Sequence, residues 1–405
     1  MKVFLCVLSL LCISMKPAEC APELQFLQII FAHKTYAPIS DLIMSNDTNF
    51  PSILTYEYFN TAPLSMPNSG MLNMYNLGVH FRETYDNFLG DVYQSETVKM
   101  HTAEYPLSMI SAQLVNAGLW PPPEIEKWST DMNWQPIPAD YVTLQEDTLL
   151  LGAHCPSFVL EMEKLLNTDH VQEALSHYSS LFNHVSQYTG MKIRQPSEIA
   201  LLYAVLETKA DLNQSLPYWA NDIFPHGGMY NVSLMEYELL WQTPLQKQLI
   251  GGTILKEVLA NSLLYIQGHI PQKRKLMMYS GNEINIVGIL KGLDLWVPHI
   301  PNEAAAVIFE MYFDNVTKSH EMKINYYTGV DGITVPLTIQ NCTEFCTITT
   351  FLHSVMDVLP QNTERLCNWE KIDLSHNNVI YSRSVSHTLE STILTLLLVI
   401  VLSVN

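Results

Sequence analysis

The stretch LQFLQIIFAHKTYAP, residues 24–38, is the part of the sequence that best indicates the fold. Its first part, residues 24–32, is short and mostly apolar, which is typical of a buried β-strand. A second strand pattern, KLMMY at 275–279, is followed by SGNE at 280–283 and by a helical pattern at 284–295. Open α/β sheets bind ligands beyond the carboxyl ends of their strands. The residues that follow these two strands are therefore the first candidates for a functional site.

Helical patterns surround these strands and fill the middle of the chain. Helices are predicted at 70–89, 106–119, 158–166, 170–188, 198–209 and 234–266. Further strands are predicted at 306–313, 323–327 and 333–339. This order indicates an α/β domain formed by residues 21–155 and 267–370, with an all-helical insertion domain at 156–266.

Composition excludes two broad classes of protein. The 405 residues are 48% hydrophobic and 15% charged, which is enough apolar surface for a sizeable core and argues against a disordered chain. Lys and Arg number 21 against 40 Asp and Glu, for a net charge of -19. A chain with this much negative charge is not expected to bind a phosphate backbone. Nucleic acid is therefore not a predicted partner.

The two ends of the chain predict a route through the secretory pathway. Residues 1–20 combine an N-terminal lysine, a short apolar run and a cleavage site expected after Cys20, as signal peptides do. Residues 371–405 form a linker and a hydrophobic tail with no Lys or Arg after the apolar run 393–404. We interpret this tail as a glycolipid-anchor signal, with attachment at Ser382 or Ser384; a short membrane-spanning tail and an unprocessed secreted tail are the alternatives. Contact with a membrane is expected only through this tail.

Glycosylation motifs and cysteines agree with that route. The five acceptor positions are Asn46, Asn213, Asn231, Asn315 and Asn341. The cysteines outside the leader are Cys155, Cys342, Cys346 and Cys367. An even number in an oxidising compartment indicates two disulfides, for which the sequence allows three pairings. No Cys/His spacing resembles a metal site, so neither a metal nor a cofactor is expected.

Two side chains at the strand ends have both a structural and a functional interpretation. His33 follows the first strand, where a lone histidine is more often a hydrogen-bonded structural residue than a catalyst. Glu283 opens the helix after the second strand, where an acidic residue is more often a charge that suits the helix dipole than a general acid.

These segments resemble the signature sites of the histidine acid phosphatases of the prostatic, lysosomal and venom type. The family's first motif is Arg-His-Gly-x-Arg-x-Pro after the first strand, and its second is Tyr-Ser-x-His-Asp before a helix. Shorter segments follow in the family's order along nearly the whole chain after the leader: NFL at 87–89, SAQ at 111–113, AGL at 117–119, WQPIP at 134–138, CP at 155–156 and YSG at 279–281. The resemblance implies a mostly parallel central sheet with helices on both faces, and a possible homodimer.

The resemblance also implies roles for the matching residues. In the family, the motif histidine attacks phosphorus, and the aspartate of the second motif protonates the leaving alcohol. The nucleophile is retained here as His33 and the motif proline as Pro38. The proton-donor position holds Glu283 in place of aspartate, with one extra methylene.

The phosphate-binding positions have changed. The two arginines of the first motif are replaced by Ala32 and Tyr36, and the glycine between them is Lys34. A third arginine falls at His101, and the second histidine is Asn282. Lys34 adds a cation but can occlude the pocket, and His101, if protonated at acidic pH, would partly replace its arginine.

The size of this loss favours an impaired site. Phosphoryl transfer depends mostly on positioning and on charge stabilisation. A charge-assisted hydrogen bond contributes about 1.5–3 kcal/mol, so three lost arginines cost on the order of 4–9 kcal/mol, or about 10³- to 10⁶-fold in rate. The family's disulfides, by contrast, map onto Cys155–Cys367 and Cys342–Cys346, while a further family pair has lost both cysteines.

Two functions of different classes follow. The first is a secreted or surface-anchored, non-catalytic binding protein that holds an unknown ligand in the former phosphate cleft. The alternative is an acid phosphatase that hydrolyses phosphate monoesters through a phosphohistidine on His33. Both are expected outside the cell or at its surface, and a lysosomal location fits the sequence less well.

Overall fold

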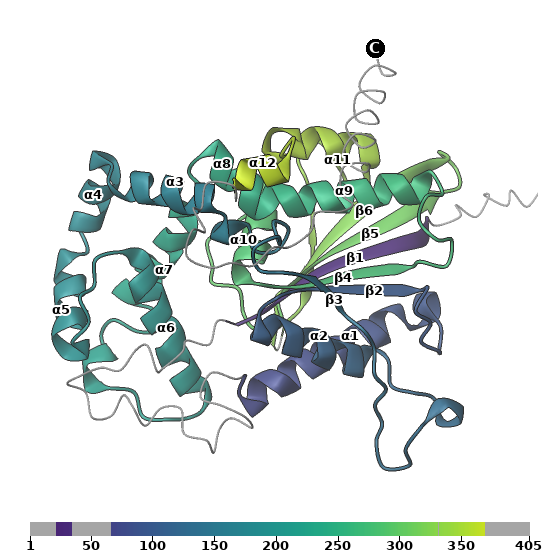
Figure 1. The fold of residues 1–405 in the computed structure, drawn as a ribbon, viewed down its shortest axis with the longest axis horizontal. Coiled ribbons are helices and arrows are strands. Elements are labelled where there is room, and N and C mark those ends of the chain that lie inside the picture. The colour runs from purple at the N-terminus through teal and green to yellow at the C-terminus, as the bar shows by residue number, and fades with distance from the viewer. Residues whose placement is uncertain (1–21, 35–65, 331, 369–405) are drawn as a thin grey trace, which may run out of the picture.

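The computed structural model describes residues 22–34, 66–330 and 332–368, and its described residues are built around one eight-stranded sheet (Figure 1). Its order is β3-β2-β4-β1-β5-β6-β7, with β8 paired to β6. The strands are β1 (Glu23–His33), β2 (Val98–Ala103), β3 (Asp140–Val142), β4 (Leu276–Asn282), β5 (Ala306–Asp314), β6 (Ser319–Tyr327), β7 (Thr334–Leu337) and β8 (Cys346–Thr347).

The sheet is mixed, whereas a mostly parallel sheet was expected. Strands β3, β2, β4 and β1 are mutually parallel, but β5 runs antiparallel to β1, and β6, β7 and β8 continue the antiparallel part. The antiparallel part forms because β5 to β7 follow one another with short connections, which suit antiparallel neighbours, while parallel strands need long crossovers. The predicted α/β class is confirmed.

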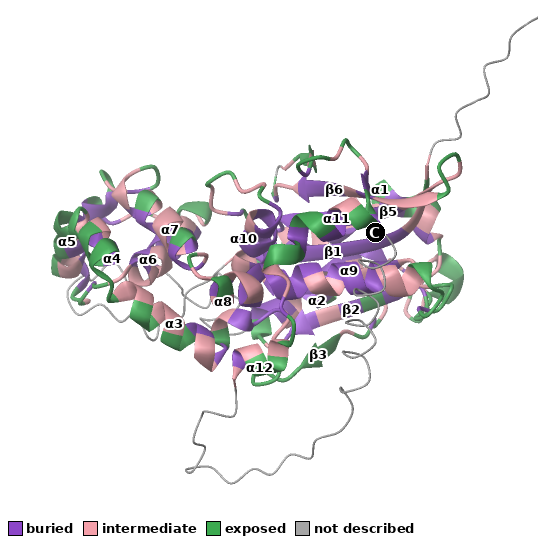
Figure 2. Cartoon of the chain, turned by 90° about the horizontal axis from the view of Figure 1, so that it is seen from above, coloured by how far each residue is buried: buried purple, intermediate pink, exposed green. Residues whose placement is uncertain are grey.

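Helices cover both faces of the sheet (Figure 1). On one face lie α1 (Asn68–Leu89) and α2 (Pro106–Leu119), whose apolar side chains join those of β1, β2 and β4 in one core. On the other face lie α9 (Thr253–Ile266), α10 (Glu283–Gly292) and α11 (Ile348–Val355) around a second core. The central strands are accordingly almost wholly buried (Figure 2).

Helices α1 and α2 approach each other closely at two glycines. A Cβ on Gly118 would lie 2.1 Å from the carbonyl oxygen of Tyr75, and one on Gly78 would lie 2.2 Å from that of Val115. Only glycine permits this approach of the two backbones. The crossing therefore fixes α2, whose first turn contributes to the site described below.

A separate block of helices lies beside the sheet (Figure 1). It contains α3 (Pro156–Leu166), α4 (Asp169–Ser176), α5 (Ser179–Thr189), α6 (Pro196–Asp211) and α7 (Gly228–Leu239). Residues of α4 to α7 enclose a core of their own. The helix predicted at 170–188 is divided between α4 and α5 in this block.

The helix predicted at 234–266 is also divided. After α7, the chain continues as α8 (Pro244–Lys247), a π-helical turn (Gln248–Gly252) and α9. The side chain of Thr243 caps α8, whose first residue is Pro244, so the break coincides with a proline. Helix α9 packs on the sheet rather than in the helical block that was expected to extend to residue 266. Pro244–Ile266 is long and apolar enough to cross a membrane, but it is mostly buried in the protein.

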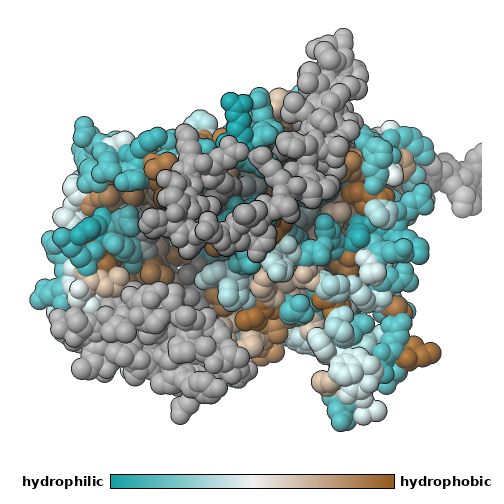
Figure 3. Space-filling model, in the orientation of Figure 1, coloured by the Kyte–Doolittle hydropathy of each residue, from teal (hydrophilic) through white to brown (hydrophobic). Residues whose placement is uncertain are grey.

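The remaining described elements are short, apart from one protruding loop. They are the 3₁₀ turns η3 (Glu124–Glu126), η4 (Gly152–His154), η5 (Tyr218–Ala220) and η7 (Met356–Val358) and the helix α12 (Thr363–Cys367). The loop around η3 exposes Ile125 and Trp128, and in Figure 3 hydrophobic patches lie among hydrophilic residues over the described surface.

The disulfide pairing implied by the family resemblance is confirmed. Cys155 is bonded to Cys367 and Cys342 to Cys346. Of the predicted glycosylation sites, Asn213, Asn231 and Asn341 are exposed and Asn315 is half-buried. The predicted leader, the C-terminal tail, Asn46, Tyr36 and Pro38 lie outside the described residues.

Candidate active site

The two predicted strand ends meet at one edge of the sheet. Strands β1 and β4 are parallel neighbours, and His33 at the end of β1 is paired with Asn282 at the end of β4. Glu283 follows as the first residue of α10. Four of the sequence-predicted residues, His33, Lys34, Asn282 and Glu283, are thereby brought to the same end of the sheet, where parallel strands place their ligand sites.

His33 is held in one orientation by both ring nitrogens. Its Nδ1 lies 2.9 Å from the carbonyl oxygen of Lys34, which can only accept, so Nδ1 carries the hydrogen. Its Nε2 then accepts from the hydroxyl of Ser108 on α2, 3.1 Å away. The ring also stacks on Tyr105, with 5.9 Å between centroids. Burial is the main cause that lowers the pKa of His33 to about 4, against the smaller effect of the Lys34 carbonyl, so the imidazole is neutral above that pH.

Lys34 turns its ammonium toward the helical block. The Nζ atom lies 3.0 Å from Oε2 of Glu207 and 2.7 Å from Oδ2 of Asp211, both on α6. Burial alone would lower the pKa of Lys34, but the attraction of the two carboxylates outweighs it and the pKa is raised. The cation that the sequence offered as a possible phosphate ligand is therefore already paired with two carboxylates.

Asn282 caps the helix that follows it. Its Oδ1 accepts from the backbone amides of Ile284 at 3.0 Å and Asn285 at 3.4 Å, while Oδ1 of Asn285 accepts from the amide of Asn282 at 2.9 Å. These bonds form a reciprocal capping arrangement. Asn282 thus stabilises the first turn of α10.

His101 does not join the other predicted residues. In the sheet, His101 on β2 lies opposite Tyr279 on β4, which lies opposite Ile30 on β1. His101 is therefore level with Ile30, which is three residues before His33. Side chains alternate between the faces of a sheet, so a residue three places before His33 faces the other way. Burial, and then the neighbouring charge of Lys99, lowers the pKa of His101 to about 4. That a protonated His101 replaces an arginine stays a prediction; the structure places its ring on the face of the sheet opposite to His33.

A cavity of about 210 Å³ opens next to Lys34 and Glu283, between the helical block and the sheet. Its wall is formed by residues of α6, α7, α10 and the segment before β5: Lys34, Ser197, Ala200, Leu201, Tyr203, Ala204, Glu207, Ser233, Glu236, Tyr237, Leu240, Glu283, Ile284, Ile300 and Pro301. Among the described residues, His33 is not part of this wall, and only 2% of its surface is exposed.

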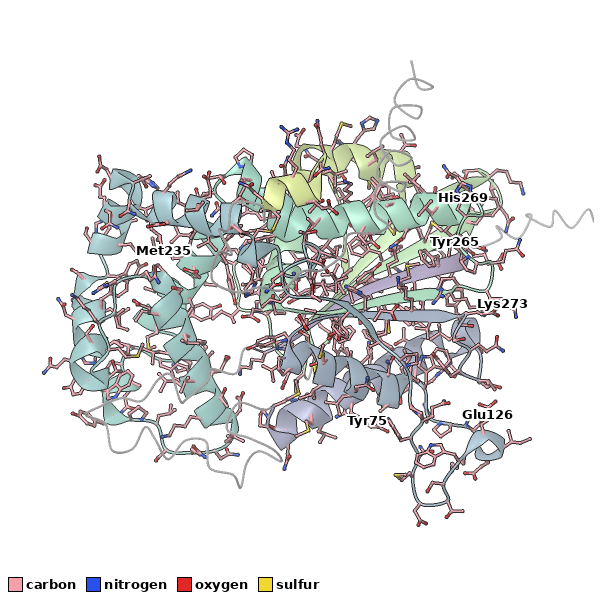
Figure 4. All side chains as sticks on the ribbon, in the orientation of Figure 1. Tyr75, Glu126, Met235, Tyr265, His269 and Lys273 are labelled. Atoms are coloured by element: carbon pink, nitrogen blue, oxygen red, sulfur yellow. A yellow bond between two sulfur atoms is a disulfide. The ribbon has the colours of Figure 1, made fainter. Side chains whose placement is uncertain are left out.

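Glu236 is an unusual member of this wall. It lies on α7, directly after Met235, which is labelled on that helix in Figure 4. Its Oε2 atom is buried and has no hydrogen-bond partner within the part of the chain that the structure describes. Burial raises the pKa of Glu236 to about 7. Burial, followed by the charge of Glu283 and other carboxylates, also raises the pKa of Tyr237 well above its ordinary value.

Sequence reasoning missed four residues of this site. They are Ser108, Glu207, Asp211 and Glu236. No local pattern marks them, because Ser108 occupies the first turn of a helix and the three acidic residues lie on helices remote in sequence from His33. Within residues 22–34, 66–330 and 332–368, no three His, Cys, Asp or Glu side chains are grouped to hold a metal ion.

A sequence model of the histidine phosphatase superfamily (branch 2) matches residues 43–327. The chain belongs to this superfamily. The match begins after His33, so it does not include residues 32–38. The position of His33 at the end of β1, beside the start of α10, is therefore shown by the structure and not by this match.

Curated members of the superfamily match over most of their length. Venom acid phosphatase Acph-1 of Apis mellifera is 32% identical over 360 residues, which cover 88% of this chain and 91% of that protein. Prostatic acid phosphatase of Rattus norvegicus is 29% identical over 366 residues, which cover 89% of this chain and 93% of that protein. Lysosomal acid phosphatase of Rattus norvegicus is 25% identical over 405 residues, covering 97% and 90%.

Solved structures of more distant members share the fold. Hafnia alvei phytase in complex with myo-inositol hexakis sulphate aligns with a TM-score of 0.63 at 15% identity, over 87% of this chain and 99% of that one. Phytase from Citrobacter braakii aligns with a TM-score of 0.60 at 14% identity, over 85% of this chain and 99% of that one. At these identities the likeness concerns the fold alone.

Proposed function

We propose that this superfamily member is a non-catalytic binding protein that uses the former substrate cleft. The observation that carries the proposal is the pairing of Lys34 with Glu207 and Asp211. Among the described residues of the cavity wall, Lys34 is the one cation, and three carboxylates accompany it. A site that must hold a phosphate group needs an excess of positive charge, and this wall has the opposite balance.

The altered motif adds to this argument. Ala32 stands where the family has its first arginine, and its side chain is wholly buried in the core. Asn282 uses its side-chain oxygen as a helix cap, and that oxygen cannot donate to a phosphate. A phosphate dianion entering beside Glu207 and Glu283 would meet like charges in a partly enclosed cavity, where repulsion is stronger than in bulk water.

One observation favours the alternative, an acid phosphatase. The Nδ1 hydrogen of His33 points to the Lys34 carbonyl, which leaves the Nε2 lone pair available as a nucleophile once the Ser108 hydroxyl turns away. The relatives named above are acid phosphatases, and Glu283 offers a carboxyl group nearby. His33 thus keeps a suitable tautomer, but the cationic ligands that would bring phosphorus to it are missing.

Hydrolysis of an aryl phosphate by the purified full-length chain at about pH 5 separates the two functions. The matched variant is His33→Ala. The presence of both disulfides and an unchanged circular dichroism spectrum verify that this variant is folded. We expect wild type and His33→Ala to give the same background rate, and vanadate to leave the melting temperature unchanged. Activity above background that His33→Ala abolishes would overturn the proposal and establish the alternative.

We further propose that the protein enters the secretory pathway and reaches the cell surface or exterior. The two disulfides support this route because such bonds persist in oxidising compartments. The exposed positions of Asn213, Asn231 and Asn341 are accessible to glycosylation. Mass spectrometry of the protein secreted from cultured cells, before and after glycosidase treatment, tests this proposal.

A further inference from the structure

The cavity beside Lys34 is small and has a largely apolar wall. Its volume of about 210 Å³ is larger than that of a cavity of about 150 Å³ that binds benzene. It is smaller than the pockets of about 300–1,000 Å³ that hold drug-sized ligands. Apolar side chains enter the wall from α6 and from other segments: Ala200, Leu201, Ala204, Leu240, Ile284 and Ile300. The cavity therefore suits a small molecule with an apolar body.

The charged groups of the wall are largely compensated within the protein. Lys34 is bound to Glu207 in the wall and to Asp211 beside it. The Oε2 atom of Glu236 is wholly buried, and burial raises the pKa of this carboxyl group to about 7, so it is mostly uncharged at lower pH. Glu283 has a partner of its own within the chain. Because an ion that leaves water for a mostly apolar site needs a free counter-charge, this wall favours an uncharged ligand.

Two tyrosines supply polar groups of the wall that are still unpaired. Tyr203 on α6 is 5% exposed and Tyr237 on α7 is 9% exposed, and both line the cavity. Within the described residues neither hydroxyl group has a hydrogen-bond partner, and neither oxygen is wholly buried, so both border the open space. Burial raises the pKa of both tyrosines, so each hydroxyl keeps its proton. Buried hydroxyl groups are normally hydrogen-bonded, so these two are available to a ligand.

A hydroxyl group matches this part of the wall better than other uncharged groups do. Its oxygen accepts from a tyrosine hydroxyl, and its own hydrogen can be donated to a carboxylate. Glu207 supplies such a carboxylate: its charge, although a smaller cause than burial, raises the pKa of both Tyr203 and Tyr237, so it lies near both hydroxyl groups. A ketone or an ether accepts but cannot donate, and a hydrocarbon does neither.

We infer that this cavity binds a small uncharged alcohol or phenol, with its hydroxyl group at the two tyrosines and its apolar body against the α6 wall. The apolar body supplies most of the binding free energy, and the hydroxyl group supplies the selectivity. This inference rests on the proposed non-catalytic function, because it names the class of ligand for the former substrate cleft.

Titration with 2-phenylethanol, followed by saturation-transfer NMR on the purified full-length chain, tests the inference. Three probes of similar size are compared with it. Propylbenzene has the same shape without the hydroxyl group, 2-phenylethylammonium carries a positive charge, and phenylacetate carries a negative charge. The four probes together separate the contribution of the apolar body from those of the hydroxyl group and of charge.

Matched variants locate the binding site. Ala200→Leu fills the cavity from the α6 wall, and Ala210→Leu, at an exposed position of the same helix, is its control. Tyr203→Phe and Tyr237→Phe each remove one hydroxyl group and keep the ring, and Tyr141→Phe, at an exposed position of β3, is their control. Melting temperatures establish that each variant folds.

We expect 2-phenylethanol to bind, propylbenzene to bind about three- to tenfold more weakly, and the two ions at least about tenfold more weakly. Ala200→Leu should weaken the binding of 2-phenylethanol at least about tenfold, whereas Ala210→Leu leaves it unchanged. At least one of Tyr203→Phe and Tyr237→Phe should lose about three- to tenfold for the alcohol and nothing for propylbenzene, while Tyr141→Phe loses neither.

Four results would each overturn the inference. They are no binding of 2-phenylethanol, equal or tighter binding of either ion, an unchanged affinity in folded Ala200→Leu, and an unchanged preference for the alcohol over propylbenzene in both Tyr203→Phe and Tyr237→Phe. If Ala200→Leu does not fold, the two tyrosine variants, which keep the shape of the wall, still decide the question.

The outcome is separable from that of the proposed function. If 2-phenylethanol fails to bind and His33→Ala does not change a background hydrolysis rate, the ligand class is wrong and the non-catalytic function stands. If an aryl phosphate is hydrolysed in a His33-dependent manner, the non-catalytic function fails whatever the alcohol does. The two experiments thus have independent readouts.

Discussion

The buried His33 and the half-buried His101 should make the folded protein sensitive to acid. Burial is the main cause that lowers the pKa of His33 and of His101 from 6.5 to about 4. Between these pH values the unfolded chain binds more protons than the folded protein, so the free energy of unfolding decreases as pH falls through the window. At about 1.36 kcal/mol per pH unit over about 2.5 units, each histidine can remove about 3.4 kcal/mol once the pH is below 4.

His101→Phe isolates the contribution of one of them. The Nε2 atom of His101 is buried without a hydrogen-bond partner in the described chain, and the ring contacts Tyr279 edge-on, so a phenyl ring suits this environment. The same linkage relation gives a loss of about 2.5 kcal/mol for one such histidine at pH 4.5 and almost none at pH 7.5. The variant should therefore lose about 2.5 kcal/mol less than wild type when the pH is lowered from 7.5 to 4.5.

Urea unfolding followed by tryptophan fluorescence at the two pH values measures this difference. The comparison between wild type and variant cancels the effect of the other titrating groups. His177→Gln, at an exposed position of the helical block, is the control and should behave as wild type. If wild type and His101→Phe lose the same free energy between pH 7.5 and 4.5, His101 is not a buried neutral imidazole and the reasoning is refuted.

Two further predictions concern the elements that position the site. Asn282→Ala removes the acceptor of the Ile284 and Asn285 amides and should lower the free energy of unfolding by about 1 kcal/mol. Asn282→Asp keeps an acceptor oxygen at the cap and is the control. Equal stability of the two variants in urea unfolding would contradict this role of Asn282. Gly118→Ala would place a Cβ 2.1 Å from the carbonyl oxygen of Tyr75, a residue of α1 labelled in Figure 4, and should cost about 1–3 kcal/mol. A thermal melt checks it, and an unchanged melting temperature would mean that α1 and α2 do not cross at this glycine.

Much of the fold was predictable because its signals are local. The apolar run before His33 and the periodicity of 70–89 and 106–119 predicted β1, α1 and α2 to within two residues at each end. Strand β2 was missed because Lys99 and His101 interrupt a short run that is otherwise apolar. The break at Pro244 was missed because apolar periodicity continues on both sides of it.

The site was predictable in part for the same reason. The strand ends at His33 and at Asn282 follow from the strand pattern, and the parallel pairing brings them together. The face on which His101 lies could not be predicted, because its position in an unpredicted strand decides that face, and a shift of one residue reverses it. The partner of Lys34 could not be predicted, since Asp211 is 177 residues away in the sequence.

The sequence alone determined the apolar run of β1, the helical periodicity of α1 and α2 and the presence of His33 after the first strand, because each of these is a matter of residue identity along the chain. Only the tertiary structure decided which charged groups surround Lys34. It brings Glu207 and Asp211 of α6 to Lys34 and turns Glu236 of α7 toward the same cavity. The physical reason is that the charge of a cleft is the sum over side chains from several elements, and the packing of the helical block against the sheet decides which of them contribute.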